Sequence, residues 1–181
     1  MTLALLALAA GARAQDAGDP FGDAPNNAKL HTASGFVCSS QLGGFERDAV
    51  GQKDPEAEAD FCAYSALDGV YGTITLRPLP PTYDPKAMLA PDFVLQEGTG
   101  GHMLGEGVAP AGPKSAPLAV YRRTYETARL ESLHYRTLFA SAAVGAWEVE
   151  VTVEYAEPRD REIEANFLNA AYAAAVARIA H

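Results

Sequence analysis

Hydrophobic and polar residues alternate along residues 147–155, where the odd positions from Trp147 to Tyr155 are apolar and the even positions are Glu or Thr. A period of two is typical of a β-strand with one face toward a core and one face toward water. Trp, Val and Tyr also suit the pleated surface of a sheet. The segment therefore predicts a strand whose odd side chains are buried and whose glutamates are solvated.

The period changes after residue 160, and the next segment predicts a helix. Its apolar residues recur at spacings of three and four: Ile163, Phe167, Ala171, Ala174, Ala175, Val176 and Ile179. That spacing forms one face of an α-helix. Glu162 and Glu164 near its start and Arg178 near its end suit the helix dipole. Because a sheet with one apolar face needs a cover, we expect this helix to pack on it.

Shorter alternating runs predict strands in the first half of the chain, at 36–39, 45–50, 60–65 and 71–77. The last two flank the turn signal Asp68-Gly69, which predicts a hairpin over 60–77. The polar residues 52–60 between the second and third runs are expected to form a loop.

Proline and glycine mark the middle of the chain. Asp84-Pro85 is a favourable helix start, with Asp as the cap and Pro in the first position. Pro91 then either ends that helix or begins a second one that runs to Gln96. Residues 98–117 are rich in Gly and Pro and predict a flexible loop.

Strands return at 118–126 and 133–139, before the alternating segment described first. The whole order predicts an α+β domain over 35–181. We expect an antiparallel sheet of about six or seven strands covered by helices.

Composition and charge narrow the function classes. With 181 residues, 48% of them hydrophobic and 20% charged, the chain fits one ordinary globular domain. The net charge of −9 argues against binding to nucleic acid or to anionic membranes.

The N-terminus predicts export. Residues 3–10 form a short apolar run, and Ala12 and Ala14 give a small-x-small cleavage pattern. The run is too short to span a bilayer, so no stable membrane insertion is expected after cleavage near Ala14. We expect a signal peptide at 1–14, a flexible tail at 15–34 and a periplasmic or secreted bacterial protein. The alternative is an Ala-rich first helix of a cytosolic protein.

The two cysteines agree with an exported protein. Cys38 and Cys62 are the chain's only cysteines, and an oxidising compartment favours a disulfide between them. A catalytic thiol or two free buried thiols are the alternatives.

Four segments together resemble the PsbP-like fold: Gly35-Phe36-Val37-Cys38, Phe45-Glu46-Arg47-Asp48, Tyr71 to Leu76, and Trp147 to Tyr155 with the helix that follows. The resemblance covers about residues 35–180 and lies in the order of elements. It implies an α/β/α sandwich around an antiparallel sheet, as in small bacterial periplasmic proteins. It also implies a binding or accessory role rather than an enzyme, and it transfers no site residue.

A basic cluster stands out in this acidic chain: Arg122, Arg123, Arg129, His134 and Arg136. Alternate positions on paired strands share a face. Arg122, His134 and Arg136 are therefore expected on the side opposite Tyr121, Tyr125 and Tyr135. The cluster suggests an anion or carboxylate site, or a patch for an acidic partner. The alternative is structural pairing with the glutamates of residues 148–154 on the neighbouring strand.

The histidines show no metal-ligand spacing, so we expect no metal and no cofactor. His31 and His181 lie near the chain ends and are expected to be solvated. His102, with Glu97 and Glu106 nearby, is the candidate for metal binding or acid–base chemistry in the 98–117 loop.

These patterns favour an exported, non-enzymatic domain that binds a protein or a cell-envelope component. One alternative is a carrier of a small ligand or anion with a pocket lined by Tyr and Arg. The other is an enzyme that uses the loop around residues 97–106.

Overall fold

The computed structural model describes residues 19–66, 69–128, 134–156 and 161–179. In these residues strands account for 54% and helices for 21%, with three helices in all. The expected helix-covered α+β sandwich is therefore wrong, since the described chain is mostly β. The cleavage site near Ala14 and Arg129 of the basic cluster lie outside the described residues.

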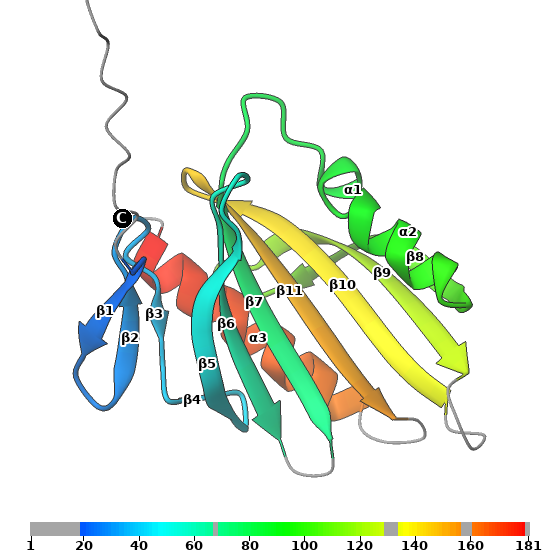
Figure 1. Cartoon of the computed structure of the whole chain (residues 1–181), viewed down its shortest axis with the longest axis horizontal. Helices are drawn as coiled ribbons and strands as arrows, with labels where there is room; N and C mark the ends of the chain where they lie inside the picture. Colours follow the sequence, from blue (N-terminus) through cyan, green and yellow to red (C-terminus); the bar gives the residue numbers. More distant parts are fainter. Residues whose placement is uncertain (1–18, 67–68, 129–133, 157–160, 180–181) are drawn as a thin grey trace, which may run out of the picture.

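The main sheet has eight antiparallel strands in the order β4-β5-β6-β7-β11-β10-β9-β8 (Figure 1). Their bounds are β4 Gln41–Leu42, β5 Phe45–Asp54, β6 Ala59–Ala66, β7 Val70–Pro78, β8 Gly101–Ala111, β9 Leu118–Ala128, β10 His134–Val144 and β11 Trp147–Ala156. The predicted hairpin over 60–77 is confirmed as β6 and β7. Strands β5 and β6 extend into residues 52–60, so most of that expected loop is strand.

A second sheet of three strands precedes the main one: β1 Phe21–Ala24, β2 Ala28–His31 and β3 Val37–Cys38. The expectation of a flexible tail at 15–34 is wrong for its described part. Asn26 and Asn27 adopt φ of 60° and 57°, which Asn tolerates better than most residues, and so turn β1 back onto β2.

The Gly/Pro-rich segment 98–117 is not a loop throughout, so this prediction was also wrong. Residues Gly101–Ala111 form β8, which pairs with β9 along its whole length. A register shift between Met103 and Gly105 marks a bulge in this edge strand. Pairing with β9 outweighs the low strand propensity of glycine, because an edge position tolerates both glycine and bulges.

The helices are α1 Pro85–Met88, α2 Ala90–Gly98 and α3 Arg161–Ile179. The predicted start at Asp84-Pro85 is confirmed, since the Asp84 side chain accepts a hydrogen bond from the Lys86 backbone N–H. Pro91 lies in the first turn of α2, where it costs no hydrogen bond.

Helix α3 lies on one face of the main sheet and contacts β4, β8, β10 and β11. In Figure 1 it crosses behind the sheet, with its C-terminal end beside the three-stranded sheet. Phe167 fills the centre of this interface, with its ring 4.4 Å from that of Phe45 and 5.5 Å from that of Tyr64. The odd residues of β11 lie on the same face, and Val149, Val151 and Val153 are fully buried there, as the alternation predicts.

The first half of the opposite face of β11 is buried, in contrast to the prediction. Glu148 and Glu150 are 0% and 1% exposed. Arg77 of β7 donates to both carboxylates, at 3.1 Å and 2.6 Å. Lys53 of β5 reaches both Glu150 and Asp92 of α2, at 3.2 Å and 3.7 Å. The glutamates are buried because a neighbouring strand supplies their counter-charge.

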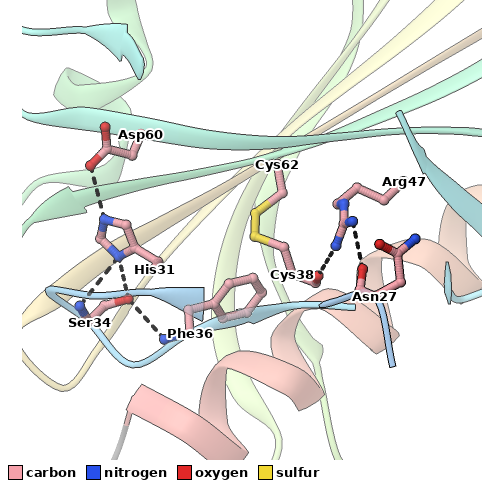
Figure 2. The surroundings of a disulfide bond; sticks show 8 residues. All are labelled: Asn27, His31, Ser34, Phe36, Cys38, Arg47, Asp60 and Cys62. Atoms are coloured by element: carbon pink, nitrogen blue, oxygen red, sulfur yellow. Dashed lines mark hydrogen bonds and ion pairs between the residues drawn. A yellow bond between two sulfur atoms is a disulfide. The ribbon is translucent and has the colours of Figure 1, made fainter. Parts of the chain in front are cut away.

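The predicted disulfide is confirmed. Cys38 of β3 and Cys62 of β6 are joined, with their Cα atoms 6.1 Å apart. The bond ties the three-stranded sheet to the main sheet (Figure 2). Arg47 of β5 strengthens the junction by donating to the backbone carbonyls of Cys38 and Asn27, at 2.6 Å and 2.7 Å.

Candidate anion-binding site

Strand register divides the basic cluster between the two faces of the main sheet. Arg122 lies opposite Ala140, and Arg136 lies opposite Tyr155, which places both arginines on the face that carries α3. Arg123 lies opposite Phe139 on the other face. Tyr121 and Tyr125 share that other face, as expected.

The expected pairing of the arginines with the β11 glutamates does not occur at Glu148 and Glu150. These two residues lie on the face opposite Arg122 and Arg136, and both pair with Arg77. Alternation fixes which residues of one strand share a face. It does not set the register of one strand against the next, so it could not predict that these glutamates and arginines lie on opposite faces.

Arg122 and Arg136 line a hollow of about 480 Å³ between the sheet and the start of α3. The complete lining is Leu104, Gly105, Glu106, Gly107, Val108, Ala109, Arg122, Thr124, Arg136 and Arg161. Three of these residues are arginines, and they come from β9, β10 and α3. Segments far apart in the sequence thus converge on one positively charged cavity.

Two glycines of β8 keep this hollow open. Gly105 and Gly107 pair with Thr124 and Arg122, which places them on the α3 face. A Cβ atom added at either glycine would meet no atom within 4 Å. A larger residue at these positions would project into the cavity, so their lack of a side chain leaves room for a ligand.

Arg136 is oriented by an acidic residue of α3. Its Nε donates to Glu164 at 3.0 Å, and the Tyr155 hydroxyl donates to the same carboxylate oxygen at 3.2 Å. A guanidinium presents five N–H donors. The Glu164 contact therefore fixes the side chain of Arg136 and leaves donors on its terminal nitrogens.

The guanidinium of Arg122 is hydrogen-bonded at one terminal nitrogen and unpaired at Nε. One terminal nitrogen donates to the Pro110 carbonyl at 2.6 Å, while Nε is buried without a hydrogen-bond partner. Burial lowers the pKa of Arg122 from its ordinary value. Its other terminal nitrogen makes no hydrogen bond within the described residues, and such a guanidinium donor suits an oxyanion in the hollow.

Arg161 completes the set from the first turn of α3. No hydrogen bond or ion pair joins it to another residue in the described part of the chain. The unpaired N–H groups and the dipole of a helix N-terminus favour negative charge, so a cation at this position is unfavourable unless an anion accompanies it.

The side chains around the hollow carry net positive charge, although the whole chain is acidic. Three guanidinium groups face it, and Glu164 offsets one of them. Glu106 also borders the hollow, but its carboxylate accepts hydrogen bonds from Tyr121 and Arg123 on the other face. The cavity is therefore locally positive in a chain whose net charge is −9.

The remaining predicted residues do not join this site. Arg123 binds Glu106 at 2.6 Å and lies 3.9 Å over the Phe93 ring of α2. His134 is exposed and pairs with Glu126 at 3.1 Å. No tyrosine of the described residues lines this hollow, and Tyr121 and Tyr125 lie on the face away from it, as the alternation predicts.

The three loop candidates are also divided. Glu97 accepts a hydrogen bond from Tyr125 at 2.8 Å and approaches Arg123, which brings it near Glu106. His102 is exposed on β8 and pairs in register with Glu126. Across the described residues, no cluster of three or more His, Cys, Asp or Glu side chains has the geometry of a metal site.

Sequence reasoning missed Arg161, Gly105 and Gly107. A usable signal was present at Arg161, because a cation in the first turn of a helix opposes the dipole. The glycines gave no such signal, because nothing in the sequence pairs Gly105 and Gly107 with β9.

The fold and this cavity define a small, disulfide-bonded, β-rich protein with an arginine-lined hollow. Searches of protein-family models and of curated proteins found no match to the chain. The resemblance to PsbP-like proteins stays a prediction. No helix in the described ranges is long and apolar enough to cross a membrane.

Proposed function

We propose that this protein is an exported binding protein for a small anionic ligand, held in the hollow of Arg122, Arg136 and Arg161. The observation that carries the proposal is the partly unsatisfied guanidinium of Arg122 in a cavity of about 480 Å³. Arginine suits carboxylate and phosphate groups because its planar fork donates two parallel hydrogen bonds.

The disposition of the arginines supports a ligand with more than one negative oxygen. They stand on three different elements, and one acidic side chain, Glu164, neutralises Arg136. A dicarboxylate or a phosphate monoester would meet several guanidinium groups at once. The apolar side chain of Leu104 at the rim would contact a short hydrocarbon portion of such a ligand.

Succinate and inorganic phosphate are suitable probes for a titration calorimetry experiment on the purified, oxidised protein. We expect saturable binding of at least one probe. Arg122→Gln should weaken it about tenfold or more, because a hydrogen bond to a charged group contributes roughly 1.5–3 kcal/mol. Gly107→Val should abolish binding with the charges intact, since its side chain would occupy the open space.

The chain offers a matched control for the charge change. Arg161 and Arg178 lie at opposite ends of α3, and Arg178 lines a different surface hollow. Arg161→Gln should weaken the probe, while Arg178→Gln should leave its affinity unchanged. Equal losses in both variants, or no saturable binding of either probe, would reject the proposal.

The export part of the proposal rests on the disulfide and on the N-terminal pattern. A disulfide persists in the periplasm or outside the cell, and it is rare in a reducing cytosol. Fractionation of a bacterial host that expresses the full chain should recover a periplasmic protein whose N-terminus is Gln15. An uncleaved cytosolic chain would contradict export without bearing on the arginine hollow.

Exposed apolar residues on α2 and β8 favour a protein partner as a second candidate function. Val94 and Leu95 are 71% and 68% exposed, and Met103 is 45% exposed on the edge strand β8. An extended segment of a partner can add a strand to such an edge. A photo-crosslinker at Met103 should then capture one extended segment. The same adducts from a crosslinker at Tyr71, an exposed residue of β7, would contradict this.

A further inference from the structure

The junction between the two sheets contains a hydrogen-bonded chain of Ser34, His31 and Asp60 (Figure 2). The Ser34 Oγ lies 2.6 Å from His31 Nδ1, and His31 Nε2 lies 2.9 Å from the Asp60 Oδ2. The expectation that His31 is solvated is wrong, because its side chain is fully buried between Phe21 and Trp147. These three residue types in this order form the hydrogen-bond chain of a serine nucleophile.

Backbone hydrogen bonds indicate which way the protons lie. The Ser34 N–H donates to His31 Nδ1 at 3.3 Å, so Nδ1 is an acceptor. The Phe36 N–H donates to the Ser34 Oγ at 3.1 Å, which leaves the hydroxyl proton of Ser34 available to Nδ1. In the tautomer that carries its proton on Nε2, His31 donates to Asp60 and its Nδ1 accepts from Ser34. That arrangement is the one a general base oriented by a carboxylate requires.

Ser34 is the most exposed of the three hydrogen-bonded residues, and His31 and Asp60 are buried. Ser34 is partly exposed in a turn whose neighbours Thr32 and Ala33 are exposed. His31 is 0% exposed, and Asp60 is 7% exposed. The residue that carries the hydroxyl is thus partly open to solvent, while the base and its carboxylate are shielded from it. The nucleophile and its base lie within hydrogen-bond reach, as nucleophilic catalysis requires.

The turn is held in place from several sides. The Gly35 N–H donates to the His31 carbonyl at 2.9 Å, and the Thr32 N–H donates to the Pro20 carbonyl at 3.0 Å. Asp60 lies on β6, two residues before Cys62, and the disulfide joins that strand to β3. The alignment of serine, imidazole and carboxylate therefore depends on the covalent tie between the sheets.

We propose that Ser34 is an activated nucleophile that accepts an acyl group from an activated ester, with His31 as general base and Asp60 as its positioning residue. This activity is independent of the anion hollow. In serine hydrolases the serine pairs with Nε2 and the carboxylate with Nδ1. Here the two ring nitrogens exchange roles, and the path of the proton is the same.

Acylation of Ser34 moves one proton and exchanges one ester bond for another. His31 Nδ1 takes the Ser34 hydroxyl proton while Oγ forms a bond to the ester carbonyl carbon. The tetrahedral intermediate then breaks its bond to the leaving oxygen, which departs with the proton from His31. The products are acyl-Ser34 and a free alcohol or phenol. Water attacks the acyl group by the same route and returns Ser34 to its first state.

The test uses 4-nitrophenyl acetate on the purified, oxidised protein, with nitrophenolate release followed by absorbance and the acetylated residue located by peptide mass spectrometry. We expect one acetyl group on Ser34 and none in Ser34→Ala. Asp60→Asn should slow acylation at saturating ester by about 10²-fold or more, since general base catalysis contributes that much. An acetyl group on lysines or other serines, with Ser34 unmodified, would overturn the proposal.

Ser65 provides the matched control. Its hydroxyl donates directly to Asp48 at 2.9 Å, with no imidazole between them. Ser65→Ala should leave the rate of nitrophenolate release unchanged, and the Ser65 peptide should stay unmodified. Thermal melts of each variant separate loss of the nucleophile from loss of the fold. An Asp60→Asn variant with a native melt and an unchanged acylation rate would also overturn the proposal.

Discussion

Arg77 holds two buried carboxylates in place on the face of β11 that points away from α3. Its guanidinium contacts Glu148 at 3.1 Å and Glu150 at 2.6 Å, and neither glutamate is more than 1% exposed. Two buried negative charges are tolerable because this arginine and Lys53 lie beside them. The arrangement makes Arg77 a structural residue rather than part of a ligand site.

Arg77→Met should therefore destabilise the protein strongly. Removing one partner of a buried ion pair typically costs about 3–5 kcal/mol, because the remaining charge is left uncompensated. Urea unfolding followed by Trp147 fluorescence measures the change. Lys29→Met is the control, since its pair with the exposed Asp23 is screened by solvent and should contribute little to stability. Similar losses in both variants would contradict the assigned role of Arg77.

Gly72 of β7 is required by the ring of Phe167. A Cβ atom at this position would lie 2.6 Å from two atoms of that ring. We expect Gly72→Ala to lower the free energy of unfolding by about 1–3 kcal/mol, as overpacking of a core does. Gly105→Ala, which meets open space, should change stability little. A neutral Gly72→Ala would mean that Phe167 can move aside without cost.

Glu106 predicts a pH dependence of stability. Hydrogen bonds from Tyr121, Arg123 and Lys86 lower its pKa from 4.5 to about 2. Because the folded pKa is depressed, the contribution is complete above pH 4.5 and is lost as the pH falls toward 2. The urea midpoint of Glu106→Gln should thus be below that of the wild type at pH 7, and the gap should narrow below pH 4.5. A gap that stays constant down to pH 3 would contradict this.

At the residue scale, the sequence predicted which residues of a strand share a face of the sheet. It predicted less well which residues of other elements they contact. Alternation put Arg122 and Arg136 together and Tyr121 apart from them. It could not predict that Arg161 would join them, because that residue reaches the sheet only through the packing of α3. His31 was misjudged because its burial depends on Asp60 and Trp147, which are distant in sequence.

At the scale of elements, the small sheet depends on its tie to β6. The disulfide joins Cys38 of β3 to Cys62 of β6, and β3 has two residues in strand geometry. Two or three short strands alone are marginal in water. Both the pairing of β1–β3 and the position of His31 therefore depend on the covalent bond.

Replacing both cysteines by serine should lower the free energy of unfolding by about 2–4 kcal/mol. Hydrogen exchange should lose protection first in β1, β2 and β3, while β7 and β11 keep theirs. The wild-type protein after reduction should behave like the double variant. Uniform loss of protection across both sheets would show that the small sheet is not a separate unit.

The elements with strong periodicity were predicted well, and those with weak periodicity were not. Strand β11, the hairpin β6–β7 and helix α3 follow from residue spacing alone. Strands β1 and β8 do not, because β1 contains Gly and Asp and β8 contains several Gly and a Pro, which indicate turns. They are strands because β2 and β9 offer unpaired backbone groups alongside them.

At the scale of the whole molecule, α3 contacts both edges of the main sheet, β4 and β8. A sheet whose two edges meet the same helix must curve around it. Gly43 and Gly112 permit this close approach, since added Cβ atoms would lie 2.9 Å from the Phe167 Cα and 3.4 Å from the Tyr172 Cβ. The expected sandwich was wrong because the eight strands form one large curved sheet around α3, with a second sheet beside it.

Hydrogen exchange should follow this architecture. β11 pairs with a strand on each side, whereas β8 is an edge strand whose side chains from His102 to Val108 are exposed. We expect β8 amides to exchange by local opening, and β11 amides only by global unfolding. Protection of β8 equal to that of β11 in the monomeric protein would contradict the edge position.

The place of α3 in the chain has a consequence for biosynthesis. Phe167, Leu168, Ala171 and Tyr172 complete the core, and they belong to the last described element to be made. Until that segment emerges, the strands that pack on α3 lack the surface that covers their apolar face. The main core of this protein is therefore completed only when translation is almost finished.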